Sequence, residues 1–292
     1  MIASKFIKQK QKTFKNEISF SGIGLHSGKK SQVIIQPGEV NSGINFLRTD
    51  VSDIKKNTLI MALWHNVSST TLSTTISNGD VSVSTIEHLM SALSGMHIDN
   101  ALILVDGPEI PIMDGSARPF VDLFENAGLI KQDEYRKILK VKKKVEVSKG
   151  DSLVKILPSD YFSIDFEIVF DSHLINRQSC QLQLINGNYK TDIASARTFG
   201  FEKDVQGLRE QGYALGGSLE NAVVVGDNKV LNKDGLRFKD EFVRHKILDS
   251  IGDLYLAGYP VQGYFSGKKS GHYLNNKLLN KLLSDHSNFE II

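Results

Sequence analysis

The strongest constraint on the fold is a succession of predicted elements that occurs twice along the chain. In the first half, apolar residues at helical spacing predict a helix from Ser84 to Leu93, and Ala101 to Val105 then reads as a strand. In the second half, a helix predicted from Asp240 to about Leu256 precedes a strand near Val261 to Phe265. Because the order and the spacing agree, we expect two domains of similar build.

A second helix is predicted in each half, from Pro119 to Asn126 and from Leu274 to Leu283. The fold class predicted is therefore α+β, with two similar domains that each layer a β-sheet with two α-helices. Small inserts are expected, with the active site at the domain interface. The predicted domains are residues 1–133 and residues 134–292, the latter with an insert near 195–220.

The charge composition argues against a nucleic-acid partner. Lysine and arginine total 35 against 33 acidic residues, a net charge of +2, so we expect no nucleic-acid partner. The lysine-rich run Lys140 to Lys144, near the predicted boundary, has no interleaved aromatic residues. It is interpreted as a solvated linker or edge strand and not as a nucleic-acid patch.

Compartment and membrane association follow from simple counts. Cys180 is the single cysteine, so no internal disulfide can form, which is typical of a reducing compartment. The segment Met1 to Lys15 lacks the apolar core of a signal peptide, and no apolar run reaches membrane-spanning length. We expect a cytoplasmic protein, without a transmembrane segment and monomeric.

The glycine-rich segment Ser21 to Gly28 predicts a turn between two strands. It is not a dinucleotide-binding loop, because serine stands at position 27 and a strand follows instead of a helix. His26 within this turn is a candidate contact to a polar substrate.

The sharpest chemical signal is the spacing of His245, Asp249 and Asp253, which fall at i, i+4 and i+8 of a predicted helix and share one face. An imidazole and a carboxylate one turn apart can reach a single zinc ion. The alternative is an ordinary pair in which Asp249 orients His245 or contacts Lys246.

A second signal lies at the start of the first-half helix, where Glu87 and His88 occupy the place that corresponds to the second-half helix with His245. If the two domains pack through these helices, His88 and His245 can meet, with Glu87 beside them as general base. The alternatives are a capping box between Ser84 and Glu87 and a satisfied core histidine at position 88.

Two further segments carry candidate residues. Lys268 to His272 is a basic loop whose histidine could act as an acid, or it is merely a capping turn. Ala196 to Phe201 contains Thr198, whose hydroxyl could donate to an oxyanion or could belong to a packed turn.

Together these motifs resemble the zinc-dependent UDP-3-O-acyl-N-acetylglucosamine deacetylases of lipid A synthesis. The resemblance covers nearly the whole chain, and its segments occur in the family's order. They are residues 21–30, 83–93, 105–117, 195–201, 235–253 and 269–277.

The resemblance implies Zn²⁺, with Fe²⁺ as the alternative, held by His88, His245 and Asp249. It implies Glu87 as general base, His272 as catalytic histidine with Asp253 as its orienting carboxylate, and Thr198 as the donor to the oxyanion. Substrate contacts are expected from His26, Phe162, Asp204, Lys246 and Lys269.

The expected reaction is hydrolysis of the N-acetyl group of UDP-3-O-acyl-N-acetylglucosamine, releasing acetate and UDP-3-O-acyl-glucosamine. One rival hypothesis is a metal-dependent amidase acting on a peptide or a simple acetylated sugar. Another is a non-catalytic binding protein in which His245 and Asp249 only stabilise a helix.

Overall fold

Two five-stranded sheets with the same strand order dominate the computed structural model, which describes residues 9–53, 57–185 and 187–292. The start of the first predicted domain, residues 1–8, lies outside these ranges. The first sheet has the order β2 (Ile18–Ile23), β3 (Lys30–Pro37), β9 (Ala101–Val105), β4 (Ile44–Arg48) and β5 (Leu59–Met61). The second has the order β12 (Val145–Lys149), β13 (Ser152–Leu157), β19 (Tyr264–Lys268), β14 (Ser163–Val169) and β15 (Arg177–Gln183).

The two sheets also agree in strand direction. In each, the third and fourth strands are parallel, β9 with β4 and β19 with β14, and the other neighbours are antiparallel. The duplication predicted from the sequence is therefore present as a repeated topology, and the α+β fold class is confirmed.

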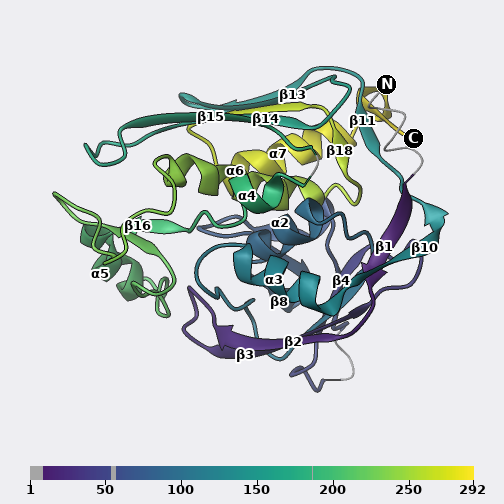
Figure 1. The fold of residues 1–292 in the computed structure, drawn as a ribbon, viewed down its shortest axis with the longest axis horizontal. Helices are drawn as coiled ribbons and strands as arrows, with labels where there is room; N and C mark the ends of the chain where they lie inside the picture. Colours follow the sequence, from purple (N-terminus) through teal and green to yellow (C-terminus); the bar gives the residue numbers. More distant parts are fainter. Residues whose placement is uncertain (1–8, 54–56, 186) are drawn as a thin grey trace.

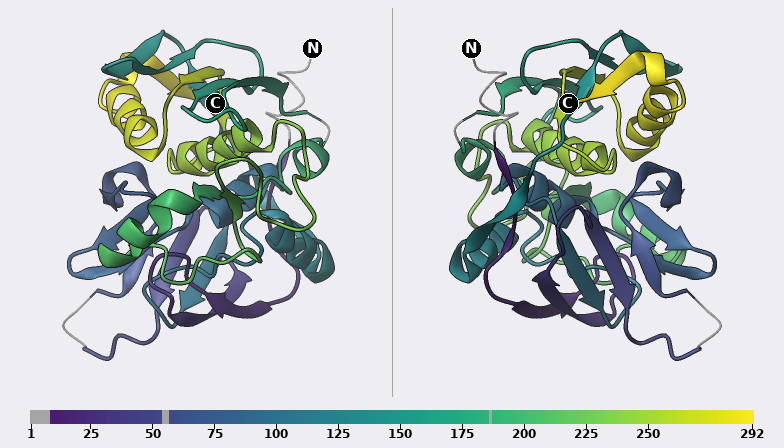
Figure 2. Two further views of the ribbon diagram at one scale, coloured as in Figure 1. Left: turned by 90° about the vertical axis from the view of Figure 1, so that its left-hand side faces the viewer. Right: turned by 90° about the vertical axis from the view of Figure 1, so that its right-hand side faces the viewer.

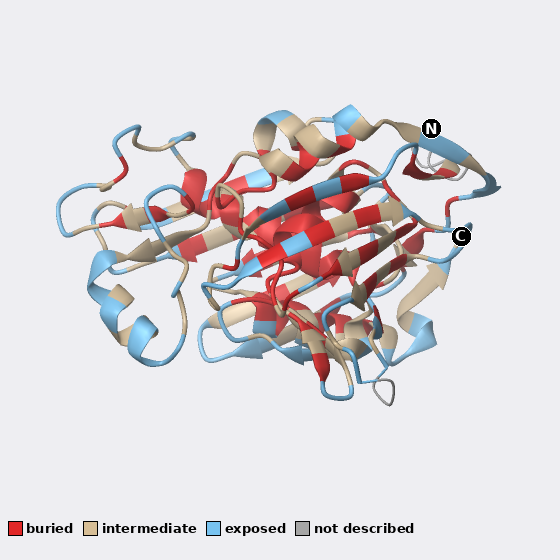
Figure 3. Ribbon diagram, turned by 90° about the horizontal axis from the view of Figure 1, so that it is seen from below, coloured by how far each residue is buried: buried red, intermediate tan, exposed pale blue. Residues whose placement is uncertain are grey.

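Four helices lie between the sheets and give the layers sheet, helices, helices, sheet (Figure 1). They are α2 (Glu87–Gly95), α3 (Arg118–Ala127), α6 (Glu241–Tyr255) and α7 (His272–Leu283). Each starts and ends within a few residues of its predicted bounds. The buried residues gather in this central part, whereas outlying segments are mostly exposed (Figure 3).

Smaller elements surround this framework, as the two side views of Figure 2 show. They comprise the pair β1 (Lys10–Phe14) and β10 (Leu129–Tyr135), the sheet β6 (Val67–Ser69), β7 (Thr75–Asn78) and β8 (Val81–Val83), and the sheet β18 (Val261–Gln262), β11 (Leu139–Val141) and β20 (Phe289–Ile291). The second half also carries α4 (Tyr189–Asp192), β16 (Phe199–Phe201), α5 (Glu202–Glu210) and β17 (Val223–Val225). Short 3₁₀ turns cover Trp64–Asn66 and His286–Asn288.

Two details differ from the prediction. The strand expected from Val261 to Phe265 is divided at Gly263, because β18 pairs with β11 whereas β19 enters the large sheet. The lysine-rich run does not form an edge strand, since β11 is the central strand of its sheet. Its lysines form ion pairs with Glu290 and Glu146, as the solvated interpretation implies.

The predicted domain boundary stays a prediction. The step from residue 133 to residue 134 falls within β10, which pairs with β1 near the start of the chain. Within the described ranges, no helix has both the length and the apolar character that crossing a bilayer requires.

Helices α2 and α6 approach each other closely because α6 has a glycine at the crossing. A Cβ atom on Gly252 would lie 2.0 Å from the carbonyl oxygen of Glu87. At the other end of α2, a Cβ atom on Gly95 would lie 2.3 Å from the ring of Tyr189, whose hydroxyl donates to Ser91 Oγ at 2.9 Å. Gly252 therefore sets how near α2 and α6 lie, and Gly95 makes room for Tyr189 of α4.

We expect Gly252→Ala to destabilise the protein by about 1–3 kcal/mol, the usual cost of overpacking, because a methyl group forces α2 and α6 apart. Gly207→Ala is the matched control, because a Cβ atom on this glycine of α5 would have no other atom within 4 Å. There we expect a gain of about 0.5–1 kcal/mol from helix propensity. Chemical denaturation of both variants measures the difference, and equal shifts would contradict the packing argument.

Candidate active site

The helix α6 presents His245, Asp249 and Asp253 on one buried face, and α2 brings His88 to it. Asp249 Oδ1 lies 3.3 Å from His245 Nε2 and 3.4 Å from His88 Nε2. The two imidazole rings meet edge to face with centroids 4.9 Å apart. One ligand atom from each of the three residues lies within 4.8 Å of the others, as a shared metal ion requires.

The hydrogen bonding of these residues fits a metal. Asp249 Oδ1 is buried and accepts no hydrogen bond, although it faces two imidazole nitrogens. His245 Nδ1 lies 3.0 Å from the Ala196 carbonyl oxygen, which can only accept, so Nδ1 carries the proton and Nε2 keeps its lone pair. Burial lowers the pKa of His245 to about 3, so the ring is neutral, as a metal ligand must be.

Lys246 contacts the same carboxylate from the other side. Its ammonium donates to Asp249 Oδ2 at 2.7 Å. Burial alone would raise the pKa of Asp249, but His245 and Lys246 outweigh it and hold that pKa well below its usual value. Asp249 is therefore ionised, and the pairing with Lys246 that the sequence offered as an alternative coexists with the histidine cluster.

Glu87 does not form the capping box. Its Oε2 accepts the backbone N–H of Thr74 at 3.0 Å, whereas the Ser84 N–H donates to the Pro108 carbonyl. Burial raises the pKa of Glu87, and its Oε1 lies 3.6 Å from His272 Nε2. The carboxylate is thus fixed by its neighbours beside the three clustered residues.

His272 is held by a buried carboxylate. Its Nδ1 donates to Asp253 Oδ2 at 2.8 Å, and Asp253 also accepts from Thr74 Oγ1 at 2.6 Å and from Asn275 Nδ2 at 2.8 Å. Burial would lower the pKa of His272, but Asp253 and Glu87 raise it to about 9. At neutral pH the ring is an imidazolium whose Nε2–H points toward Glu87.

The glycine turn forms another side of the site. Buried Glu109 accepts the backbone N–H groups of His26 and Ser27 at 2.9 and 2.7 Å and the Thr85 hydroxyl at 2.8 Å. Burial lowers the pKa of His26, and His272 and His88 are near enough to lower it further. His26 Nδ1 lies 3.4 Å from the Ala214 amide of the second-half insert. His26 therefore lies between the cluster and that insert.

The segment with Thr198 borders the metal-ligand cluster through its backbone and neighbours. The Ala196 carbonyl contacts His245, and the Phe199 ring lies 6.4 Å from the His245 ring. Thr198 lies between them and is fixed by backbone hydrogen bonds to Gly115 and Val223. The role predicted for the Thr198 hydroxyl stays a prediction.

The remaining predicted contacts are spread more widely. Lys269 follows β19, bonds through its amide to the Glu167 carbonyl and forms an ion pair with Asp151. Asp204 lies on an exposed part of the first turn of α5. Phe162 precedes β14 and is not brought to this site, because the Lys269 amide meets the opposite end of β14 at Glu167.

Several residues that help to form this site were not predicted from the sequence. Asn275 is three residues after His272, so helical spacing alone could have suggested it. Thr74 and Glu109 lie in loops with no periodic signal. Phe170, directly after β14, packs its ring against Phe199 with centroids 5.6 Å apart. Phe170 lies at the end of β14 opposite Phe162, and through Phe199 it borders the His245 ring.

Comparison with known proteins agrees with the resemblance found in the sequence. Residues 11–284 match the family model described as LpxC: UDP-3-O-acyl N-acetylglycosamine deacetylase. A UDP-3-O-acyl-N-acetylglucosamine deacetylase of Syntrophus aciditrophicus (strain SB) is 48% identical over 279 residues, 96% of this chain and 88% of the relative. One of Pseudomonas entomophila (strain L48) is 47% identical over 285 residues, 97% of this chain and 93% of the relative.

We expect the purified protein to bind one divalent metal ion per chain and His245→Ala to lose it, because the variant removes one of three protein ligands. His173→Ala, a change at an exposed histidine, is the control and should keep the metal. Metal analysis after exhaustive dialysis gives the readout. Full metal content in His245→Ala would show that the ion lies elsewhere.

Proposed function

The chain belongs to the family of UDP-3-O-acyl-N-acetylglucosamine deacetylases, and from this premise we propose how its residues perform the reaction. The enzyme is an amide hydrolase. It removes the N-acetyl group of UDP-3-O-acyl-N-acetylglucosamine in lipid A synthesis, which yields acetate and the free amine. The observation that carries the residue assignments is the buried cluster of His88, His245 and Asp249 beside Glu87 and His272.

The metal we propose is Zn²⁺, with Fe²⁺ as the alternative, because two imidazoles and one carboxylate suit both ions. When bound, such an ion polarises the amide carbonyl and acidifies a water molecule. The unpartnered Oδ1 of Asp249 and the lone pair on His245 Nε2 support this assignment.

Glu87 is the general base. Its Oε2 is occupied by the Thr74 amide, so Oε1 is the oxygen that takes the proton from the attacking water. Burial makes the carboxylate a stronger base than an exposed glutamate, since it raises the pKa of Glu87.

His272 is the proton donor. Asp253 holds the ring through Nδ1, and Thr74 and Asn275 in turn hold Asp253, so Nε2–H faces the reacting group in one orientation. An imidazolium there stabilises the negative charge of the tetrahedral intermediate and then protonates the leaving amine. We propose that the Thr198 hydroxyl donates to the same oxyanion.

Substrate binding uses the surroundings of this cluster. Lys246 and Lys269 supply positive charge for the diphosphate, with His26 and Asp204 as further polar contacts. For the acyl chain we propose the second-half insert, where Leu215 and Leu219 expose 49% and 47% of their surface. Leu72, 49% exposed, precedes Thr74 by two residues and extends the apolar surface toward the site.

We expect Glu87→Gln to lower turnover by about two to four powers of ten while the metal stays bound, because the amide cannot accept the proton. Glu39→Gln, a change at an exposed glutamate, is the control. Acetate release from the UDP-linked 3-O-acyl substrate gives the readout. Wild-type turnover in Glu87→Gln would remove Glu87 from the role of base, and metal-free turnover would refute the mechanism.

We expect Leu215→Asp to lower kcat/KM for the acylated substrate by about 10- to 100-fold, because one buried leucine contributes about 1.5–3 kcal/mol. The same variant should treat a substrate without the acyl chain as the wild type does. Steady-state kinetics with both substrates checks this. A wild-type enzyme indifferent to acyl truncation would instead favour an amidase for simple acetylated sugars.

A further inference from the structure

A buried ion pair between Arg197 and Glu241 lies one helical turn from the metal-ligand cluster. Glu241, in the first turn of α6, is fully buried, and Arg197 is 8% exposed. The guanidinium meets both carboxylate oxygens, since Arg197 Nε donates to Oε1 at 2.9 Å and Nη2 donates to Oε2 at 3.2 Å. Glu241 and His245 stand at i and i+4 of α6, so they share one face of the helix.

The carboxylate of Glu241 also holds backbone groups. Its Oε1 accepts the N–H of Arg197 at 3.0 Å, and its Oε2 accepts the N–H of Arg237 at 2.6 Å. Each oxygen therefore has two N–H donors, which compensates the buried charge. Arg197 Nη2 donates in addition to the Gly235 carbonyl at 2.7 Å. One carboxylate thus fastens the loop before α6 and the segment around Arg197 to the start of α6.

The peptide group between Ala196 and Arg197 connects this ion pair to the metal ligand. Its carbonyl accepts from His245 Nδ1 at 3.0 Å, and its N–H donates to Glu241 Oε1. A peptide group is planar and rigid, so the two hydrogen bonds hold opposite ends of one plane. Residues 196–198 lie outside any helix or strand, and the orientation of this plane therefore depends on individual hydrogen bonds.

His245 is the imidazole whose orientation the protein fixes. A hydrogen bond to the ring nitrogen that does not bind the metal sets the tautomer and the direction of the other nitrogen. His88 Nδ1, in contrast, is buried and has no hydrogen-bond partner in the described part of the chain. Buried ion pairs can often be replaced by apolar residues without loss of stability, so stability alone does not account for a pair in this place.

We infer that Arg197 and Glu241 are positioning residues of the metal site. They clamp the peptide between residues 196 and 197, whose carbonyl keeps His245 Nε2 directed at Asp249 Oδ1, 3.3 Å away. The inference rests on the proposed function, because it takes His245 as a ligand of the metal ion. Removing a group that orients a metal ligand typically lowers metal affinity by about 10- to 100-fold.

The experiment follows Co²⁺ in the full-length protein during competition with a chelator. The visible absorption of Co²⁺ reports both its occupancy and the geometry of its ligands. We expect Glu241→Gln to bind Co²⁺ about 10- to 100-fold more weakly and with a changed absorption spectrum. Whichever way the new amide lies, its NH₂ group faces two of the four N–H donors, so the clamp cannot keep all its bonds.

Arg197→Lys is the conservative variant. It keeps the positive charge and the backbone N–H that donates to Glu241, but it loses the two-point contact of the guanidinium. We therefore expect it to bind Co²⁺ more weakly than the wild type and more tightly than Glu241→Gln.

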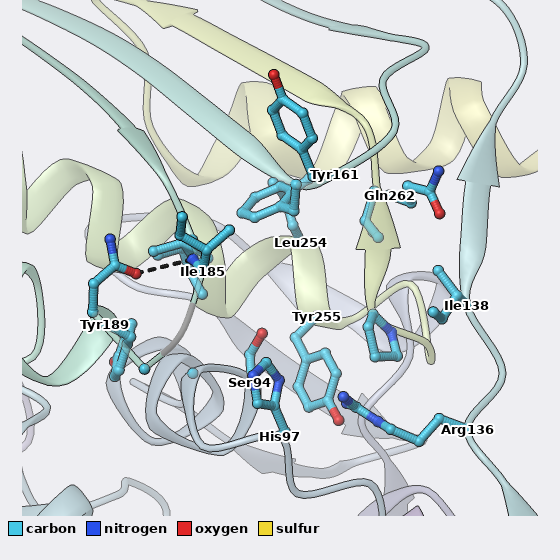
Figure 4. A pocket seen from close by; sticks show the side chains of 18 of the residues that line it. Ser94, His97, Arg136, Ile138, Tyr161, Ile185, Tyr189, Leu254, Tyr255 and Gln262 are labelled. Carbon is cyan, nitrogen blue, oxygen red and sulfur yellow. Dashed lines mark hydrogen bonds between the residues drawn. The ribbon is translucent and has the colours of Figure 1, made fainter. Parts of the chain in front are cut away.

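Asp99→Asn is the matched control, because it breaks another buried ion pair. Asp99 Oδ1 lies 2.8 Å from Arg136 Nε, and the two side chains are 10% and 1% exposed. Arg136 lies in the wall of a cavity, and Figure 4 shows its side chain directed toward Tyr255. Tyr255 follows His245 by ten positions, about 15 Å along α6. We expect Asp99→Asn to lose stability while its Co²⁺ affinity and spectrum stay those of the wild type.

Chemical denaturation of the metal-free proteins measures stability separately from metal binding. Weaker Co²⁺ binding with a changed spectrum in Glu241→Gln, but not in Asp99→Asn, supports the inference. Wild-type affinity and spectrum in Glu241→Gln, or an equal loss of affinity in Asp99→Asn, would overturn it. If Glu241→Gln does not fold, the same comparison between Arg197→Lys and Asp99→Asn decides. A wild-type protein that binds no Co²⁺ would refute the proposed metal site and this inference with it, whereas the other outcomes leave that site standing.

Discussion

The close contact between α2 and α6 is the constraint on which the rest of the site depends. Gly252 lies against the backbone of Glu87, so the two helices approach nearer than any side chain would allow. This approach brings His88 to His245 and Asp249, which no single helix could achieve, since the three ligand atoms come from two halves of the chain. A packing feature of the core thus sets the geometry of the chemistry.

The same contact concentrates ionisable groups in a largely buried region. Glu87, Asp249, Asp253 and His272 are all buried, and burial of charges is costly unless each has partners. Asp253 has three donors and Asp249 has Lys246, yet Asp249 Oδ1 has none. The proposed divalent cation would supply the missing interaction, so metal binding should contribute to the stability of this region as well as to its chemistry.

From the sequence, the elements that have a periodic pattern of apolar residues could be predicted. Helical spacing gave α2 and α6, and the repeat implied that His88 and His245 could meet, because equivalent helices of two similar units pack symmetrically. Spacing carries no information about loops, so Thr74 was missed although it links Glu87 to Asp253. The duplicated sheets could be expected, but their shared strand order follows from long-range pairing that no local pattern encodes.

The placement of Phe162 shows how a match of residue type can mislead. An aromatic residue was expected near the nucleotide, and β14 has one at each end, Phe162 before it and Phe170 after it. Pairing of β14 with β19 decides between them, since the parallel register places Glu167 beside Lys268 and directs the end of β14 toward His272. Phe170 then packs with Phe199 beside the cluster, while Phe162 lines the cavity with Arg136. The two ends of β14 therefore lie in different surroundings, one beside the metal-ligand cluster and the other in the wall of a cavity that residues of α2 and α6 also line.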